Sequence, residues 1–205
     1  MTPLKEEHSR PESLTKEDSS WKLYRECRKI RDTKTVYYLL IISLFVFSFI
    51  NLSSFMSVEE TISRLKGVSE NLLTTSITIL GFSLAAYSIF ATLSDKDLLI
   101  FMHNTKHPDY VHSYLKVAHF TFIKNIYDIL LLAALAFFCS QSIPILSALN
   151  NSSHLDDDKL LLFISIILTV IQSVFIVLFD ITKSFVYNVF QSVLTATRWH
   201  KQDKP

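Results

Sequence analysis

The sequence predicts an all-α integral membrane protein with four transmembrane helices, cytoplasmic termini and short amphipathic interfacial helices. Four long runs carry almost no charge: 36–55, 72–93, 126–149 and 160–179. A helix of about 20 residues crosses the roughly 30 Å hydrocarbon core of a bilayer. The 49% of hydrophobic residues, with 16 phenylalanines, gather in these runs, so little of the 205-residue chain is left for a soluble domain.

Basic residues predict the topology. Seventeen of the 20 Lys and Arg lie before the first run, between the second and third runs, or after the fourth. The positive-inside rule therefore places both termini and the middle connection in the cytoplasm. The predicted organisation is a cytoplasmic tail with a basic juxtamembrane helix (1–35), a transmembrane domain (36–180) and a cytoplasmic amphipathic extension (181–205).

The segment 21–35 predicts a juxtamembrane helix whose aromatic edge, with Trp21, Tyr24 and Cys27 at a spacing of three, rests on lipid headgroups. Near an anionic surface, each basic residue contributes about 1 kcal/mol to binding. The alternative is that the basic residues only fix the topology. The predicted headgroup-facing residues are Lys22, Arg25, Arg28, Lys29, Arg31 and Lys34.

The first run, 36–55, has no file of small residues, so we expect it to face lipid. Ser57 and Glu60 after it have capping-box spacing, and Gly67 fits a helix stop. These signals predict a separate short amphipathic helix on the outer surface. Asn51 draws notice only as a polar interruption that fits a glycosylation pattern.

The second run, 72–93, is the predicted packing hub. Its small residues recur at steps that average 3.6, the α-helical period, and Gly81-x-x-x-Ala85 is a close-approach motif of membrane helix pairs. The seam joins copies of the chain, or it packs against small residues of the third run such as Ala133 and Ala136. The predicted seam residues are Thr74, Thr78, Gly81, Ala85, Ser88 and Thr92.

The connection after this run predicts a short interfacial helix, because Ser94 and Asp97 have capping spacing before the apolar residues 98–102. It also gathers four of the seven histidines, and His103 and His107 have ligand spacing for one helical turn. Pro108 argues against a continuous helix there. No further ligand completes a metal set, so we expect polar loop residues and assign neither metal nor cofactor.

One carboxylate and two amide side chains fall inside the third and fourth runs: Asp128, Gln141 and Gln172. Asp128 is a functional candidate by default, although Lys124 four residues earlier offers a structural partner. An unpaired amide in a membrane is costly, so Gln172 should bond to another helix or line a wet cavity. Pro144 predicts a bend or break in the third helix, whereas no breaker follows the fourth run.

No nucleotide loop, zinc helix, nucleophile elbow or paired carboxylates are present, so the sequence predicts a non-enzymatic protein. The leading interpretation is an oligomeric membrane sensor or scaffold that relays a membrane disturbance to a cytoplasmic partner. A pore-forming effector that depolarises the membrane, or a small multimeric exporter, remains an alternative.

The stretch TTSITILGFSLAAYSIFATLSDKDLLIFM (74–102), with the order of the four spans, resembles the small membrane subunit of bacterial Kiwa-type anti-phage defence systems. The resemblance implies an inner-membrane homo-oligomer that senses a phage-induced disturbance of the envelope. It also implies a cytoplasmic, DNA-binding protein partner, while the chain itself contacts lipid and no nucleic acid. No catalytic residues come with this resemblance.

Overall fold

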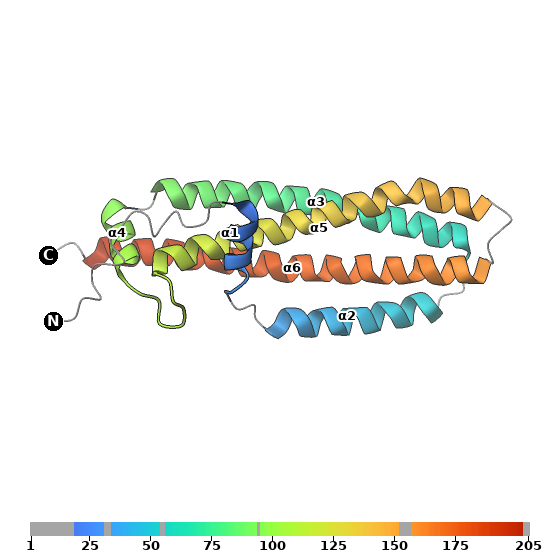
Figure 1. Cartoon of the computed structure of the whole chain (residues 1–205), viewed down its shortest axis with the longest axis horizontal. Coiled ribbons are helices and arrows are strands. Elements are labelled where there is room, and N and C mark those ends of the chain that lie inside the picture. Colours follow the sequence, from blue (N-terminus) through green and yellow to red (C-terminus); the bar gives the residue numbers. More distant parts are fainter. Residues whose placement is uncertain (1–18, 31–33, 54–55, 94, 152–156, 203–205) are drawn as a thin grey trace. The chain divides into compact units, whose positions relative to one another are not determined.

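The computed structural model describes residues 19–30, 34–53, 56–93, 95–151 and 157–202 (Figure 1). Within these ranges the chain is helical, with no strand beyond an isolated bridge between Lys106 and Ser113. Four of the helices, α2, α3, α5 and α6, are long and apolar enough to cross a membrane. The helices are α1 (Ser20–Cys27), α2 (Lys34–Ser53), α3 (Val58–Leu93), α4 (Lys96–Asn104), α5 (Tyr114–Asn151) and α6 (Asp157–Gln202).

The chain forms two compact units. The bundle unit comprises 32–81 and 128–183, and the terminal unit comprises 1–31, 82–127 and 184–205. Helices α3, α5 and α6 contribute residues to both units, whereas α2 belongs to the bundle unit alone.

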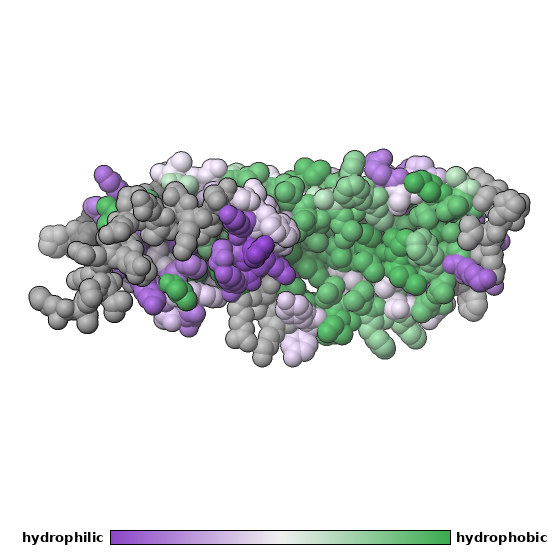
Figure 2. Space-filling model, in the orientation of Figure 1, coloured by the Kyte–Doolittle hydropathy of each residue, from purple (hydrophilic) through white to green (hydrophobic). Residues whose placement is uncertain are grey.

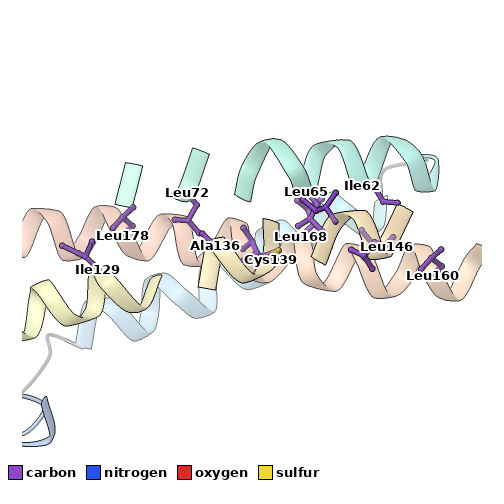
Figure 3. Packing of buried hydrophobic residues seen from close by; sticks show 13 residues of the cluster. Ile62, Leu65, Leu72, Ile129, Ala136, Cys139, Leu146, Leu160, Leu168 and Leu178 are labelled. Carbon is purple, nitrogen blue, oxygen red and sulfur yellow. The ribbon is translucent and has the colours of Figure 1, made fainter. Parts of the chain in front are cut away.

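The core of the bundle unit comes from three helices (Figure 3). Leu65 and Leu72 of α3 pack with Ala136 and other residues of α5, and with Leu168 and its neighbours on α6. Among the described residues, α2 supplies no member of this cluster. It instead exposes most of its apolar side chains, and Figure 2 shows hydrophobic surface over the bundle unit. This exposed apolar surface is compatible with the lipid contact expected of the first run, which stays a prediction.

Helix α3 is longer than the sequence predicts. Ser57 and Glu60 form the expected capping box: the Ser57 N–H donates to Glu60 Oε2 at 3.0 Å, and the Glu60 N–H donates to Ser57 Oγ at 3.3 Å. The stop at Gly67 is wrong, because α3 continues through it to Leu93. A single glycine costs a helix only about 1 kcal/mol, and the buried stripe of Leu65 and Leu72 runs across it.

The third and fourth runs also extend into longer helices. Pro144 lies inside α5, so the helix does not break there, and the alternative of a bend stays a prediction. Helix α6 continues past the membrane run to Gln202, which confirms the expected helical extension. Asp157 and Asp158 occupy its first turn, where carboxylates stabilise the helix dipole; Asp156 lies outside the described residues.

In the terminal unit, α1 packs on the first turns of α5. Cys27 and Ile30 are buried against Val117 and Phe120, and Tyr24 contacts Tyr127 with ring centroids 5.4 Å apart. The expectation that Tyr24 and Cys27 rest on headgroups is therefore wrong, because this edge of α1 packs on protein. The short helix α4 is present as predicted, but its N-cap is Asp95, whose side chain accepts from the Asp97 N–H; Ser94 lies outside the described residues.

Candidate interaction surfaces

Helix α3 carries two files of small residues on different faces. The predicted seam residues, from Thr74 to Thr92, are all exposed. A second file, Ser69, Ser76 and Ser83, is completely buried. Because these serines recur every seven residues, they share one face with Leu65 and Leu72. The buried serine file, and not the predicted seam, is the face of α3 that packs inside the chain.

The small residues of the third run pack against α3, as predicted. They contact the face of α3 that carries the buried serine file and not the face that carries the predicted seam. Ala133 and Ala136 are buried, and Ala136 belongs to the same cluster as Leu72. Ser69 Oγ donates to Cys139 Sγ at 3.3 Å. The expectation that the seam residues themselves pack on the third helix is therefore wrong.

The outward seam has room for a close neighbour. A Cβ atom added at Gly81 would meet nothing within 4 Å among the described atoms. Thr78 and Ser88 direct their hydroxyls to carbonyl oxygens one turn earlier in their own helix, both at 2.9 Å. With its hydroxyls satisfied internally and no bulky side chain in the file, this face suits close approach of another helix.

The polar group that the sequence reasoning missed is Asn51. Its Nδ2 donates to Thr169 Oγ1 and to Gln172 Oε1, each at 2.9 Å, and joins α2 to α6. The bond to another helix expected of Gln172 is thus present. Asn51 is buried, and this tether joins α6 to a helix that exposes most of its apolar side chains.

The other intramembrane polar residues differ in burial. Asp128 is half-buried and Gln141 is exposed, so these two predicted residues do not converge with Gln172 into one polar site. Asp180 is buried and accepts a hydrogen bond from Lys183 through Oδ1, the pair that their spacing of three on a helix predicts. Its Oδ2 has no partner among the described atoms.

The predicted headgroup-facing residues of α1 are exposed where the structure describes them, namely Lys22, Arg25, Arg28 and Lys29. Arg31 and the side chain of Lys34 lie outside the described part. Lys29 pairs with Glu26 at 2.6 Å, and this hydrogen bond lowers the pKa of the Glu26 carboxyl. The stabilising effect of this pair is present above the ordinary glutamate pKa and is lost as the pH falls through the lowered value.

The histidines of the connection contact different aromatic rings. His107 packs against Tyr110 and Tyr114, with ring centroids 4.9 and 4.7 Å away. His119 Nδ1 lies 3.1 Å from the Tyr87 hydroxyl. Over the searched, described residues, no three His, Cys, Asp or Glu side chains come close enough to hold a metal ion.

No protein-family model, no curated protein and no solved structure matches this chain.

Proposed function

We propose that this chain is an oligomeric membrane sensor or scaffold without enzymatic activity, which relays a membrane disturbance to a cytoplasmic protein partner. The observation that carries the proposal is the contrast between α2 and the rest of the bundle unit. Helices α3, α5 and α6 share an apolar core, whereas α2 exposes most of its apolar side chains and is attached through Asn51. A helix with much lipid contact and few packing contacts responds readily to bilayer strain.

The chain sequence gives α2 a direct connection to a cytoplasmic element. Only residues 28–33 separate α1 from α2, and α1 packs on α5 through Cys27 and through Ile30 just after it. The terminal unit that includes α1 holds fifteen of the 20 Lys and Arg, which supports a cytoplasmic location by the positive-inside rule. A displacement of α2 would therefore pull on α1.

The end of α6 offers a surface for the partner. Val186, Phe190 and Val193 are exposed at helical spacing, with more than half of each side chain accessible. An amphipathic helix with such a face is a common docking element for proteins. Copies of the chain would assemble through the outward face of α3, which has no large side chains along the file from Thr74 to Thr92.

By the resemblance of 74–102, we place the chain in the bacterial inner membrane, in anti-phage defence beside a DNA-binding partner. The test is a pull-down of the full chain from native membranes in mild detergent, with the mass of the complex measured by light scattering. We expect a homo-oligomer with a co-purifying soluble protein, and reduced recovery of that protein when Phe190 and Val193 are both changed to Ser. Monomers without any partner would overturn the proposal.

A second experiment tests the sensing step. Asn51→Leu removes the tether of α2, while Ser43→Ala removes only a hydroxyl that bonds Leu40 within the same helix at 3.0 Å. With phage challenge as the stimulus, we expect Asn51→Leu to change protection of the host and Ser43→Ala to leave it unchanged. Equal protection by both variants and the wild type would exclude α2 as the sensing element.

A further inference from the structure

A polar groove opens between the first turns of α3 and the last turns of α5, within the bundle unit. Its volume is about 500 Å³, room for roughly a dozen or more water molecules at about 30 Å³ each. Ile62, Ile143 and Pro144 form the apolar part of its wall. Its polar lining residues are Glu59, Ser63, Lys66, Ser140, Ser147 and Asn150.

Lipid-facing side chains surround this groove. Helices α3 and α6 begin at the same end of the bundle unit (Figure 1), and the core joins their first turns. At this level α6 exposes Leu162 and Phe163, and α5 exposes Ile145. Within a membrane-spanning bundle, a polar ligand would favour charged side chains beside these apolar ones, because exposure of a charge to hydrocarbon costs several kcal/mol.

The groove has opposite charges at its two ends. The hydrogen bond between Ser69 and Cys139 fixes the antiparallel alignment of α3 and α5, so Lys66 lies near Ser140 at the deep end and Glu59 lies near Asn150 at the outer end. The two charged residues are seven positions apart, about 10 Å along the helix axis, and both side chains are long enough to approach one bound group.

Pro144 adds hydrogen-bonding capacity. A proline has no N–H, so the Ser140 carbonyl lacks the donor that normally lies four residues later in a helix. Ser140 lines the groove beside Pro144. Broken helical hydrogen bonds at membrane depth are tolerated where they line a cavity or bind a ligand.

We propose that this groove binds the headgroup of a phospholipid that carries a phosphate and a primary ammonium. The phosphate binds Lys66 and the serine hydroxyls at the deep end, and the ammonium binds Glu59 and the Asn150 carbonyl oxygen at the outer end. This order matches a lipid whose chains run toward the bilayer centre, where Phe137 and Phe138 are exposed on α5. The inference requires a membrane-spanning bundle and does not depend on the relay.

Glu70, the acidic residue beside Lys66 on α3, does not take the place of a bound phosphate. Glu70 Oε1 lies 4.0 Å from Lys66 Nζ, and both side chains are more than half exposed. A pair of this kind contributes little, because water screens it. Glu59 makes no ion pair that the structure describes, so the outer end of the groove retains its negative charge.

Native mass spectrometry of the full chain in mild detergent, titrated with phosphatidylethanolamine or phosphatidylglycerol, tests the proposal. We expect about tenfold tighter binding of phosphatidylethanolamine, the effect of one charge-assisted hydrogen bond. Glu59→Gln should abolish this preference by weakening phosphatidylethanolamine only. Lys66→Gln should weaken both lipids by about tenfold, because both carry a phosphate.

Matched controls lie on the same turns of α3. Glu60→Gln and Arg64→Gln change charges that do not line the groove, so both variants should bind lipid as the wild type does. Equal binding of the two lipids by the wild type would overturn the proposal, as would equal losses in the test and control variants. A disulfide between copies through Ser63→Cys in native membranes would show that a second copy covers the groove, and would overturn it as well.

Discussion

The two faces of α3 carry similar small side chains in different surroundings. On one face, Ser69 and Ser76 are completely buried against the helices of the same chain. On the other, Thr78 and Gly81 are exposed, and no atom in the described part of the chain lies within 4 Å of a Cβ atom built at Gly81. Small residues permit close approach of another helix on both faces. The buried face makes contacts that stabilise the folded chain, whereas the exposed face is accessible to another helix.

The largest expected loss of stability comes from adding bulk to the closed face, the buried face of α3 that carries Ser69 and Ser76. Ser76→Leu places a large side chain where the serine has no accessible surface. Overpacking of this kind costs about 1–3 kcal/mol, and more where the backbone cannot shift. Unfolding of the purified protein in detergent, followed by circular dichroism against denaturant, measures the loss.

Thr78→Leu is the matched control for this change, because it adds similar bulk two residues away on the open face, the exposed face of α3 that carries Thr78 and Gly81. We expect it to leave the free energy of unfolding of the monomer within about 0.5 kcal/mol of the wild type. If both leucine variants destabilised the protein equally, the assignment of the two faces would be wrong.

The next largest expected loss of stability comes from removing the hydrogen bonds of Asn51. Asn51→Leu removes one buried and one partly buried hydrogen bond and leaves Gln172 Oε1 without this donor. Side-chain hydrogen bonds in membrane proteins contribute about 0.6 kcal/mol on average and up to about 1.7, so we expect a loss of about 1–2 kcal/mol in the same unfolding measurement. Ser43→Ala, which removes a bond inside α2, should cost less than half of this, and an equal loss would mean that α2 needs no tether.

These contacts also show where the sequence predicts the structure and where it does not. Local signals suffice for the capping box of Ser57 and Glu60 and for the continuation of α6, because the partners lie within a few residues. The tether of Asn51 joins residues 118 and 121 positions apart, and no local pattern identifies the partner. The stop at Gly67 is wrong because packing of Leu65 and Leu72 outweighs one glycine.

The face of α3 that packs inside the chain was open to prediction. A file of small residues such as Thr74, Thr78 and Gly81 indicates that another helix can approach closely. It does not indicate which helix does so. The additional signal is the repeat of seven that places Ser69 and Ser76 in line with Leu65 and Leu72, since a stripe that also contains large apolar residues is the one that forms a core. No sequence pattern of this kind predicts the groove lined by Glu59 and Lys66, because the groove depends on how α5 aligns with α3.

Bulk on the open face tests whether a second copy uses it. Gly81→Leu should leave the stability of the monomer almost unchanged, because the position is exposed and a Cβ atom there meets no described atom within 4 Å. It should weaken self-association, because a leucine prevents close approach of two helices. Native mass spectrometry across a dilution series measures the shift toward monomer, and Ile77→Leu on the exposed surface is the control. An unchanged oligomer in Gly81→Leu would remove the seam from any interface between copies.

The smallest effect distinguishes shape from hydrogen bonding on the closed face. Ser76 Oγ is buried and has no hydrogen-bond partner among the described atoms, whereas Ser69 Oγ donates to Cys139 Sγ. A buried hydroxyl without a partner costs free energy, so Ser76→Ala should be neutral or stabilise the protein by up to about 1 kcal/mol. Ser69→Ala should instead destabilise it by a few tenths of a kcal/mol, through loss of a weak bond to sulfur. Both are read from the same unfolding curves. A loss above about 1 kcal/mol for Ser76→Ala would mean that the hydroxyl is required, and that small size alone does not explain this serine.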